Sequence, residues 1–222
     1  MACAGSETTG QYNFSAMRER MVETQIRARD LQNATVLDAM RLVPRHLFVP
    51  DDLKPFAYDD RPLPIGHHQT ISQPYIVAYM TDALQLEPAH TVLEIGTGSG
   101  YQAAILADIA RQVYSIEIVP DLAETAKRAI AAAGYTNVEV RTGNGYLGWR
   151  EHAPFDRIIV TAAPPDIPDA LVEQLAVGGV MVLPVGTANQ EIVVITKTPA
   201  GIAQKRAIQV RFVPMVSRPK EP

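Results

Sequence analysis

The segment Thr91-Val-Leu-Glu-Ile-Gly-Thr-Gly-Ser-Gly-Tyr101 is the part of this 222-residue chain that says most about its fold. It opens with a short apolar run rich in β-branched side chains, which is typical of a buried strand. Glycines then occupy alternate positions, so the backbone can turn sharply and a ligand can approach where no Cβ stands in the way. A helical pattern over residues 101–110 follows. The segment therefore predicts a strand, a tight turn open to a ligand, and a helix.

The alternation of strand and helix continues toward the C-terminus. Strands are expected over residues 92–95, 113–118, 138–141 and 157–161, and helices over residues 101–110, 121–133 and 168–175. This alternation predicts a doubly wound α/β fold with a mostly parallel sheet covered on both faces. After Gly178-Gly179, strands over residues 180–185 and 192–196 are separated by so short a loop that they must be antiparallel. With a last strand over residues 207–213, we expect a Rossmann-like sheet of about five parallel strands that ends in an antiparallel hairpin.

Residues 15–90 have a different pattern, and we expect them to form N-terminal helices and a substrate or lid loop. Ser15 can cap a first helix, residues 34–42 form a second, and Pro74 is placed to open a third. Residues 44–69 are rich in proline and lack periodicity, which indicates a long loop. We expect one domain over residues 15–222, with the α/β core in residues 91–222 and a disordered leader over residues 1–14.

The composition argues against several classes of partner. Hydrophobic residues make up 47% of the chain, charged residues 20%, and the formal net charge is −4. A mildly acidic chain disfavours a nucleic-acid partner, because phosphate binding needs clustered Lys and Arg. No apolar run reaches the roughly 18 residues of a membrane span. Cys3 is the single cysteine, and the five histidines lack metal-ligand spacing. We expect a monomeric cytoplasmic protein that binds no metal ion, membrane or nucleic acid.

The glycine turn favours a nucleoside cofactor with an amino-acid end rather than a pyrophosphate. A pyrophosphate is bound by G-x-G-x-x-G, whereas Gly96, Gly98 and Gly100 are spaced G-x-G-x-G and follow Glu94, which can pair with a cationic group. About twenty residues beyond the turn, Glu117 lies where an acid can accept both hydrogen bonds of a ribose diol. Each feature alone also fits a plain chain reversal or a surface acid. Together at one sheet edge they indicate S-adenosylmethionine.

Two loop segments can complete the site. The turn Gly143-Asn144-Gly145 follows the third strand and can meet an adenine edge, although Asn and Gly are also ordinary turn residues. Ser72, in Gln69-Thr-Ile-Ser-Gln-Pro-Tyr75, lies just before the expected helix start at Pro74. Its hydroxyl can satisfy free N–H groups of that helix or donate to an acceptor carboxylate. The residues themselves leave both roles open.

Beyond these patterns, the chain from about Met17 to Val216 resembles the protein-L-isoaspartate O-methyltransferase family. The resemblance implies methyl transfer from S-adenosylmethionine to the α-carboxylate of L-isoaspartyl, and D-aspartyl, residues of damaged proteins and peptides. A carboxylate is ionised at pH 7, so its methylation needs no general base. The segments that carry the resemblance are Val43-Pro-Arg-His-Leu-Phe-Val-Pro50, Thr70-Ile-Ser-Gln-Pro74, Val92-Leu-Glu-Ile-Gly-Thr-Gly-Ser-Gly-Tyr-Gln102, Phe155-Asp156, Thr161-Ala-Ala-Pro-Pro165, Leu183-Pro-Val-Gly186 and Arg211-Phe-Val-Pro214.

The resemblance also implies roles for individual residues, with Ser72 as the active-site residue. Those implied to bind the cofactor are Thr70, Ile71, Glu94, Gly96, Gly98, Ser99, Glu117, Ile118, Asn144 and Gly145. Those implied to bind the substrate are Ile65, Gly66, Ala162, Ala163, Pro164, Val213 and Pro214. Many relatives carry Asp at the position of Asn144, so this chain departs from the family's pattern at the adenine contact.

Three other functions compete with protein repair. A methyltransferase for a small molecule or another protein site shares the glycine turn, although not the Thr-Ile-Ser-Gln-Pro segment. A nicotinamide-dependent oxidoreductase is disfavoured by the glycine spacing and by the expected C-terminal hairpin. A non-catalytic nucleoside-binding module would have little use for both Glu117 and Ser72.

Overall fold

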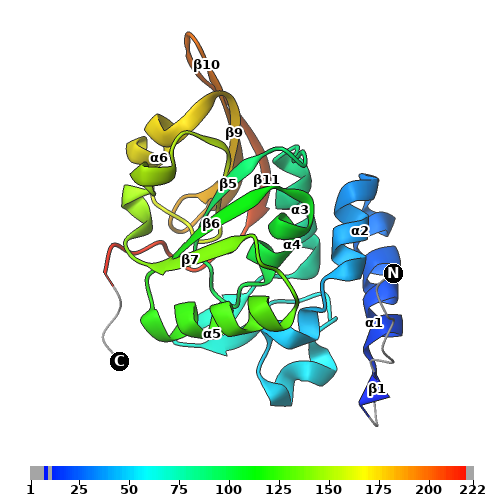
Figure 1. Ribbon diagram of the computed structural model, residues 1–222. Coiled ribbons are helices and arrows are strands. Elements are labelled where there is room, and N and C mark those ends of the chain that lie inside the picture. The colour runs from blue at the N-terminus through cyan, green and yellow to red at the C-terminus, as the bar shows by residue number, and fades with distance from the viewer. Residues whose placement is uncertain (1–7, 10–11, 219–222) are drawn as a thin grey trace.

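The computed structural model describes residues 8–9 and 12–218, and a seven-stranded sheet forms the centre of this part of the chain (Figure 1). The strand order is β11-β10-β9-β8-β5-β6-β7. The strands from β9 to β7 are parallel, and β10 and β11 continue antiparallel. The expected Rossmann-like fold with a C-terminal antiparallel hairpin is confirmed. The strand bounds are β5 (Thr91–Ile95), β6 (Gln112–Glu117), β7 (Val138–Thr142), β8 (Phe155–Val160), β9 (Leu175–Val185), β10 (Gln190–Thr198) and β11 (Gly201–Val210).

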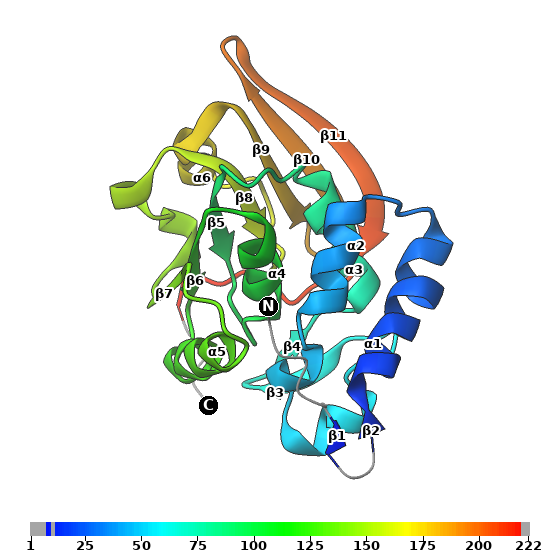
Figure 2. The same ribbon diagram turned by 45° about the vertical axis from the view of Figure 1, so that its right-hand side comes forward.

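The C-terminal strands are longer than expected and project beyond the rest of the sheet (Figure 2). β9 begins before Gly178, which adopts a φ of +84° within the strand instead of ending the preceding element. The expected last strand over residues 207–213 is wrong at both ends. β11 pairs with β10 as far as the turn between Thr198 and Gly201, so it starts earlier. It also stops at Val210, and the chain then leaves the sheet to pair with Ala163.

The sheet has a hydrophobic core on each face, because successive strand side chains point to opposite sides. Val92 packs in the core that includes the N-terminal helices, α4 and α5. Its neighbour Leu93 packs in the second core, with Trp149 and α6. α4 is buried on nearly all sides because the sheet, α2 and α3 surround it. The helices on these faces are α4 (Tyr101–Ile109), α5 (Pro120–Ala132) and α6 (Asp169–Gln174).

The N-terminal helices pack beside α4. α1 (Phe14–Met21) continues through a π-helical stretch, η1 (Val22–Ile26), and is followed by α2 (Ala34–Leu42) and α3 (Pro74–Ala83). The expected cap at Ser15 is wrong, since Ser15 lies within the helix. Instead Asn13 caps α1, and its Oδ1 accepts a hydrogen bond of 3.0 Å from the Ala16 N–H. None of the helices in the described residues is long and apolar enough to cross a membrane.

The expected disordered leader over residues 1–14 is wrong at its C-terminal end. Strand β2 (Tyr12–Asn13) pairs with β1 (Thr8–Thr9), and Phe14 is buried. The Phe14 ring stacks on the His46 ring, with 4.1 Å between the centroids. The remainder of the expected leader, residues 1–7 and 10–11, lies outside the described residues.

Residues 44–69 were expected to form one long loop, but the structure contains four short elements in and around that range. Two are 3-10 helices, η3 (Arg45–Phe48) and η4 (Asp51–Phe56). The others are the strands of a hairpin, β3 (Leu63–Gly66) and β4 (Gln69–Ile71). Its turn uses His67 and His68, both with positive φ, which matches the twist of a two-residue hairpin. This hairpin carries Thr70 and Ser72 to the carboxyl edge of the sheet.

Candidate active site

The glycine turn follows β5 and is held by hydrogen bonds to β6 and to Thr161, the residue after β8. Gly96 has a φ of +94°, and its N–H donates to the Ile116 carbonyl oxygen at 2.8 Å. A Cβ on Gly96 would lie 2.5 Å from Oγ1 of Thr161, and that hydroxyl donates to the carbonyl oxygens of Ile95 and Gly96. The turn therefore needs glycine at this position for both its backbone conformation and its packing.

Glu117 ends β6 directly beside the turn. Its Oε2 accepts a hydrogen bond of 2.8 Å from the Gly98 N–H, and its Oε1 accepts one of 3.0 Å from the Val119 N–H. Each carboxylate oxygen has a second lone pair that can accept another hydrogen bond. The side chain is 5% exposed and lines a cavity, so it fits the expected pairing with a ribose diol.

Glu94 lies on the other side of the turn, fully buried, and lines none of the cavities described below. Its Oε2 accepts a hydrogen bond from the Ser115 hydroxyl, which lies 2.5 Å from the Thr97 hydroxyl. Among the described residues, no group donates to Glu94 Oε1. Burial raises the pKa of this carboxyl to about 8. The structure therefore does not bring Glu94 to the cavity walls, where the expected direct contact with a cationic ligand group would form. Glu94 instead supports the turn through Ser115, whose hydroxyl contacts that of Thr97.

Three adjoining cavities lie at this edge of the sheet in the described part of the molecule. We call them the Glu117 cavity, of about 70 Å³, the Ser99 cavity, of about 40 Å³, and the large cavity, of about 790 Å³. Thr70 and Thr161 line all three. Gly96 and Gly98 line the first two, and Ser72 lines the Ser99 cavity and the large cavity. Ser72 thus lies where the space beside the glycine turn meets the large cavity.

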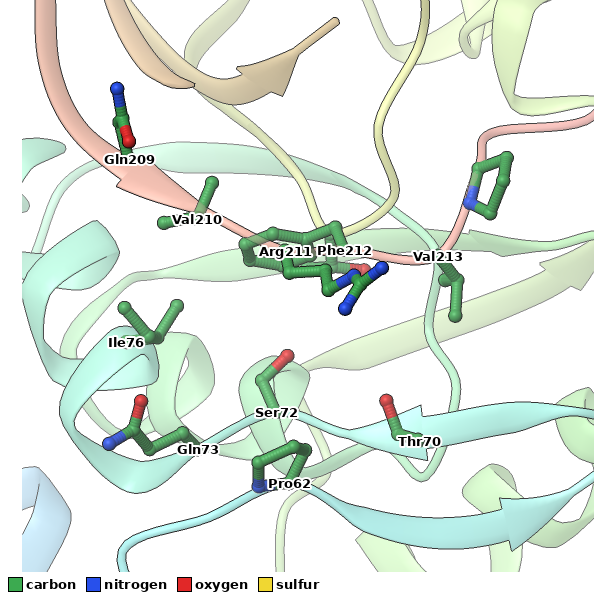
Figure 3. A pocket seen from close by; sticks show the side chains of 12 residues that line it. Pro62, Thr70, Ser72, Gln73, Ile76, Gln209, Val210, Arg211, Phe212 and Val213 are labelled. Atoms are coloured by element: carbon green, nitrogen blue, oxygen red, sulfur yellow. The ribbon is translucent and has the colours of Figure 1, made fainter. Parts of the chain in front are cut away.

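The Ser72 hydroxyl points into the large cavity (Figure 3). The cap residue of α3 is Gln73, and no side chain provides a capping bond there among the described residues. Ser72 therefore does not act as the helix cap. Its backbone is fixed by Arg45, whose Nη2 donates to the Ser72 carbonyl oxygen at 2.8 Å.

The structure brings most of the expected site residues to the cavity walls. Of the cofactor set, Thr70, Ile71, Gly96, Gly98, Ser99, Glu117, Ile118 and Gly145 line the Glu117 or Ser99 cavities. Of the substrate set, Ala162, Val213 and Pro214 line the Glu117 or large cavities. Those that the structure places outside the cavity linings are Glu94, Asn144, Ile65, Gly66, Ala163 and Pro164.

Local bonding explains two of these absences. The Asn144 side chain accepts a hydrogen bond of 3.0 Å from the Tyr146 N–H and so closes its own turn. Ala163 donates its N–H to the Val213 carbonyl oxygen at 2.8 Å and accepts the Met215 N–H at 2.8 Å. Ala163 was expected to bind substrate, but both of its backbone polar groups are paired within the protein.

The cavity residues without a predicted role include Thr161, Gln73, Arg211 and Phe212. Thr161 follows β8, and its position at the carboxyl end of a parallel strand was a signal that could have identified it. Gln73 follows Ser72, and its Nε2 donates to Asp60 Oδ1 at 2.7 Å. Arg211 lies beyond the end of β11, in the same segment as Val213 and Pro214, and the substrate role expected for those two residues was a signal that could have pointed to it.

Comparison with known proteins agrees with this geometry. Residues 16–220 match the family model described as protein-L-isoaspartate(D-aspartate) O-methyltransferase. The chain is 57% identical over 211 residues to the protein-L-isoaspartate O-methyltransferase of Synechococcus sp. (strain JA-2-3B'a(2-13)), covering 91% of this chain and 86% of the relative. It is 54% identical over 204 residues to the Gloeobacter violaceus protein of the same name, covering 90% of this chain and all of the relative (100%).

Two solved structures share the fold at 26% sequence identity and a TM-score of 0.82. One is a protein-L-isoaspartate O-methyltransferase, with 91% of this chain and 67% of that chain covered. The other is described as a putative protein-L-isoaspartate O-methyltransferase from Plasmodium falciparum in complex with S-adenosyl-L-homocysteine, with 90% and 99% covered. The match over nearly the whole chain, together with the site geometry, shows that this chain belongs to the protein-L-isoaspartate(D-aspartate) O-methyltransferase family.

Proposed function

We propose that this chain transfers a methyl group from S-adenosylmethionine to the α-carboxylate of L-isoaspartyl residues, and also D-aspartyl residues, in damaged proteins and peptides. One observation carries the proposal. The Ser72 hydroxyl lies at the junction between the large cavity and the Ser99 cavity beside the glycine turn. A peptide carboxylate in the large cavity would meet the methyl donor there. Membership of the family supports the same reaction.

The cavities beside the glycine turn fit the methyl donor. Gly96 and Gly98 carry no side chain into the groove between the carboxyl ends of β5 and β8, where a ligand can lie against the backbone. Glu117 has acceptor capacity left for the two ribose hydroxyls. S-adenosylmethionine supplies a methyl group on a sulfonium, which is a good leaving group for direct transfer. The P. falciparum structure described with S-adenosyl-L-homocysteine supports this choice.

The lining of the large cavity suits methylation of an anion. It contains no Asp, Glu, His or Lys among the described residues, so it offers no evident general base. A carboxylate with a reference pKa near 4 is already the nucleophile at neutral pH and needs none. The protein then has to align the carboxylate oxygen with the methyl group of the donor, and such alignment can lower the barrier by roughly 7–11 kcal/mol. We assign to Ser72 a hydrogen bond from its hydroxyl to the acceptor carboxylate.

Roles for the other site residues are part of the proposal. The eight residues of the expected cofactor set that line the Glu117 or Ser99 cavities bind the donor, and Val213 and Pro214 form a wall of the large cavity that contacts the peptide. Glu94 does not touch the ligand in this proposal and stabilises the turn through the side chains of Ser115 and Thr97. A monomeric, cytoplasmic state stays a prediction from composition, which size-exclusion chromatography and cell fractionation test.

The deciding experiment measures transfer of a radiolabelled methyl group to paired peptides that differ only in an isoaspartyl or an aspartyl linkage. We expect labelling of the isoaspartyl peptide and little of its partner. Equal labelling would indicate a methyltransferase for another protein site. Absence of labelling, with S-adenosylmethionine still bound in a calorimetric titration, would indicate a nucleoside-binding module or an enzyme for a small molecule.

A further inference from the structure

Arg211 is the one charged residue among the described residues that line the large cavity. It lies on the wall formed by the segment after β11, opposite the wall that carries Thr70 and Ser72. Figure 3 shows its guanidinium extending into the space toward the hydroxyls of those two residues. Among the described residues, no carboxylate forms an ion pair or hydrogen bond with Arg211. The cavity therefore has two hydroxyls on one wall and an unpaired cation on the other.

The backbone beside Arg211 is fixed by a buried glutamine. Gln190, at the start of β10 and 8% exposed, accepts the Phe212 N–H on Oε1 at 2.6 Å. Its Nε2 donates to the Phe212 carbonyl oxygen at 3.1 Å. The Gln190 amide thus forms the two backbone hydrogen bonds that a neighbouring strand would otherwise provide where the chain leaves the sheet. The Arg211 side chain is exposed, but the backbone next to it is fixed on the side of the cavity opposite Ser72 (Figure 3).

We propose that Arg211 is a substrate-binding residue that pairs with the acceptor carboxylate. The proposal rests on the proposed function, since it concerns the anion methylated there. Guanidinium presents several N–H donors in a planar fork, and a carboxylate accepts two of them side by side. In this arrangement the carboxylate lies between the Arg211 guanidinium and the Ser72 hydroxyl.

The charge balance of the reaction makes this pairing selective for substrate over product. A carboxylate oxygen forms a bond to the methyl carbon, and the carbon–sulfur bond breaks with its electron pair left on sulfur. No proton moves. The anion and the sulfonium become a neutral ester and a neutral thioether. The ester cannot form an ion pair with Arg211, so the pairing that binds substrate is lost on the product.

The same argument predicts which kinetic constant depends on Arg211. The carboxylate bears its full charge in the bound substrate and less in the transition state, so the ion pair is at least as strong before transfer as during it. An interaction made equally in both states affects KM and leaves kcat unchanged. We expect Arg211→Gln to raise KM for an isoaspartyl peptide about tenfold, with kcat within about twofold of the wild type, as for loss of a charge-assisted hydrogen bond. Arg211→Lys keeps the charge without the fork and should give a smaller rise.

Arg206 offers a matched control. It lies on β11 outside the cavity lining and pairs with Glu191 at 2.8 Å. Arg206→Gln changes the net charge of the chain by the same amount as Arg211→Gln, so it reports any effect of general electrostatic attraction. We expect its KM to stay within about twofold of the wild type.

A second measurement uses a neutral analogue of the substrate, an isoaspartyl peptide whose α-carboxylate is replaced by a carboxamide. Inhibition of the wild type should be clearly weaker with the carboxamide than with an unmodified competing isoaspartyl peptide. In Arg211→Gln the two affinities should converge. Unchanged KM in Arg211→Gln, a full carboxylate preference in that variant, a loss confined to kcat, or an equal effect of Arg206→Gln would each overturn the proposal. Failure of wild-type transfer to the isoaspartyl peptide would instead overturn the proposed function.

Discussion

The fully buried guanidinium of Arg45 donates a hydrogen bond of 2.8 Å from Nη2 to the backbone oxygen of Ser72. Its Nε donates to the Ala57 carbonyl oxygen at 2.7 Å, and its Cζ lies 4.8 Å from the centre of the Tyr101 ring. Burial lowers its pKa to about 10, so it stays charged at neutral pH. Arg45 therefore joins the segment before the hairpin to the segment that presents the Ser72 hydroxyl.

We predict that Arg45→Lys lowers kcat about tenfold, because a small displacement of Ser72 misaligns the reacting atoms. A lysine ammonium cannot form the two-sided fork and leaves one carbonyl unpaired, so the free energy of unfolding should also fall by about 1–3 kcal/mol. Steady-state kinetics well below the melting temperature separates the two effects. Affinity for S-adenosylmethionine should change little, since Arg45 lines none of the three described cavities. A folded variant with wild-type kcat would show that Arg45 is structural only.

Ser72→Ala should lower turnover while leaving the affinity for S-adenosylmethionine within a few fold. The hydroxyl caps no helix and is hydrogen-bonded to no described side chain, so thermal unfolding should also be nearly unchanged. Isothermal titration with the methyl donor and methyl-transfer rates with an isoaspartyl peptide test the two halves of this prediction. Loss of donor binding in the variant would refute the role assigned to Ser72.

Gly96→Ala should abolish tight binding of S-adenosylmethionine, because the added Cβ would lie 2.5 Å from Thr161 Oγ1 in the wall shared by all three cavities. Gly134→Ala is a control for backbone strain alone. Gly134 has a φ of +89°, close to the +94° of Gly96, but nothing lies within 4 Å of its added Cβ. Both variants should lose roughly 1 kcal/mol to the left-handed backbone conformation. A calorimetric titration should show weakened binding for Gly96→Ala alone, and equal binding by both variants would contradict the packing argument.

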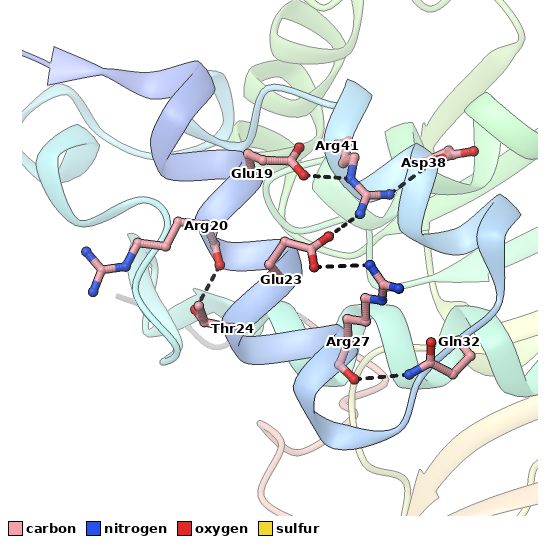
Figure 4. Close-up of polar contacts among 8 residues, drawn as sticks. All are labelled: Glu19, Arg20, Glu23, Thr24, Arg27, Gln32, Asp38 and Arg41. Carbon is pink, nitrogen blue, oxygen red and sulfur yellow. Dashed lines mark hydrogen bonds and ion pairs between the residues drawn. The ribbon is translucent and has the colours of Figure 1, made fainter.

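The fold could be predicted because the central strands β5, β6 and β8 are largely buried and alternate with helical patterns. The elements missed in and around residues 44–69 are three to six residues long, and η4 and β3 each contain a proline, so no period could develop. The bonds between distant segments were also invisible in the sequence. Figure 4 shows Arg41 of α2 bound to Glu19 and Glu23, which lie on α1 and η1. That pairing depends on how two helices pack, which local patterns do not encode.

The site was predicted to the correct edge of the sheet but not always to the correct side chain. Glu94 and Glu117 both lie at the ends of strands, yet Glu117 reaches the cavity and Glu94 does not. Glu94 is the register partner of Ser115 in the neighbouring strand, so the two side chains share a face and hydrogen-bond beneath the turn. The sequence shows that successive side chains of a strand point to opposite faces of the sheet, but only the packing shows which side chains reach the ligand site.

Glu94 also leads to a prediction about stability and pH. Burial raises its pKa to about 8, whereas the same carboxyl in the unfolded chain titrates near 4.5. Between these values the folded state holds the proton and the unfolded state does not, so a rise in pH favours unfolding. This group should therefore reduce the free energy of unfolding between about pH 4.5 and pH 8, by up to about 1.4 kcal/mol per pH unit.

Glu94→Gln removes the titration while keeping an oxygen that can accept the Ser115 hydroxyl. We expect the variant to match the wild type near pH 5 and to be more stable than it at pH 8, when urea unfolding is measured across this range. Glu139→Gln, on the exposed side of β7, removes a carboxyl without altering burial and should keep the wild-type slope. If Glu94→Gln retained that slope as well, Glu94 would be ionised in the folded protein, with a partner for Oε1. The buried carboxyl beneath the turn would then act as a fixed negative charge instead of a neutral support.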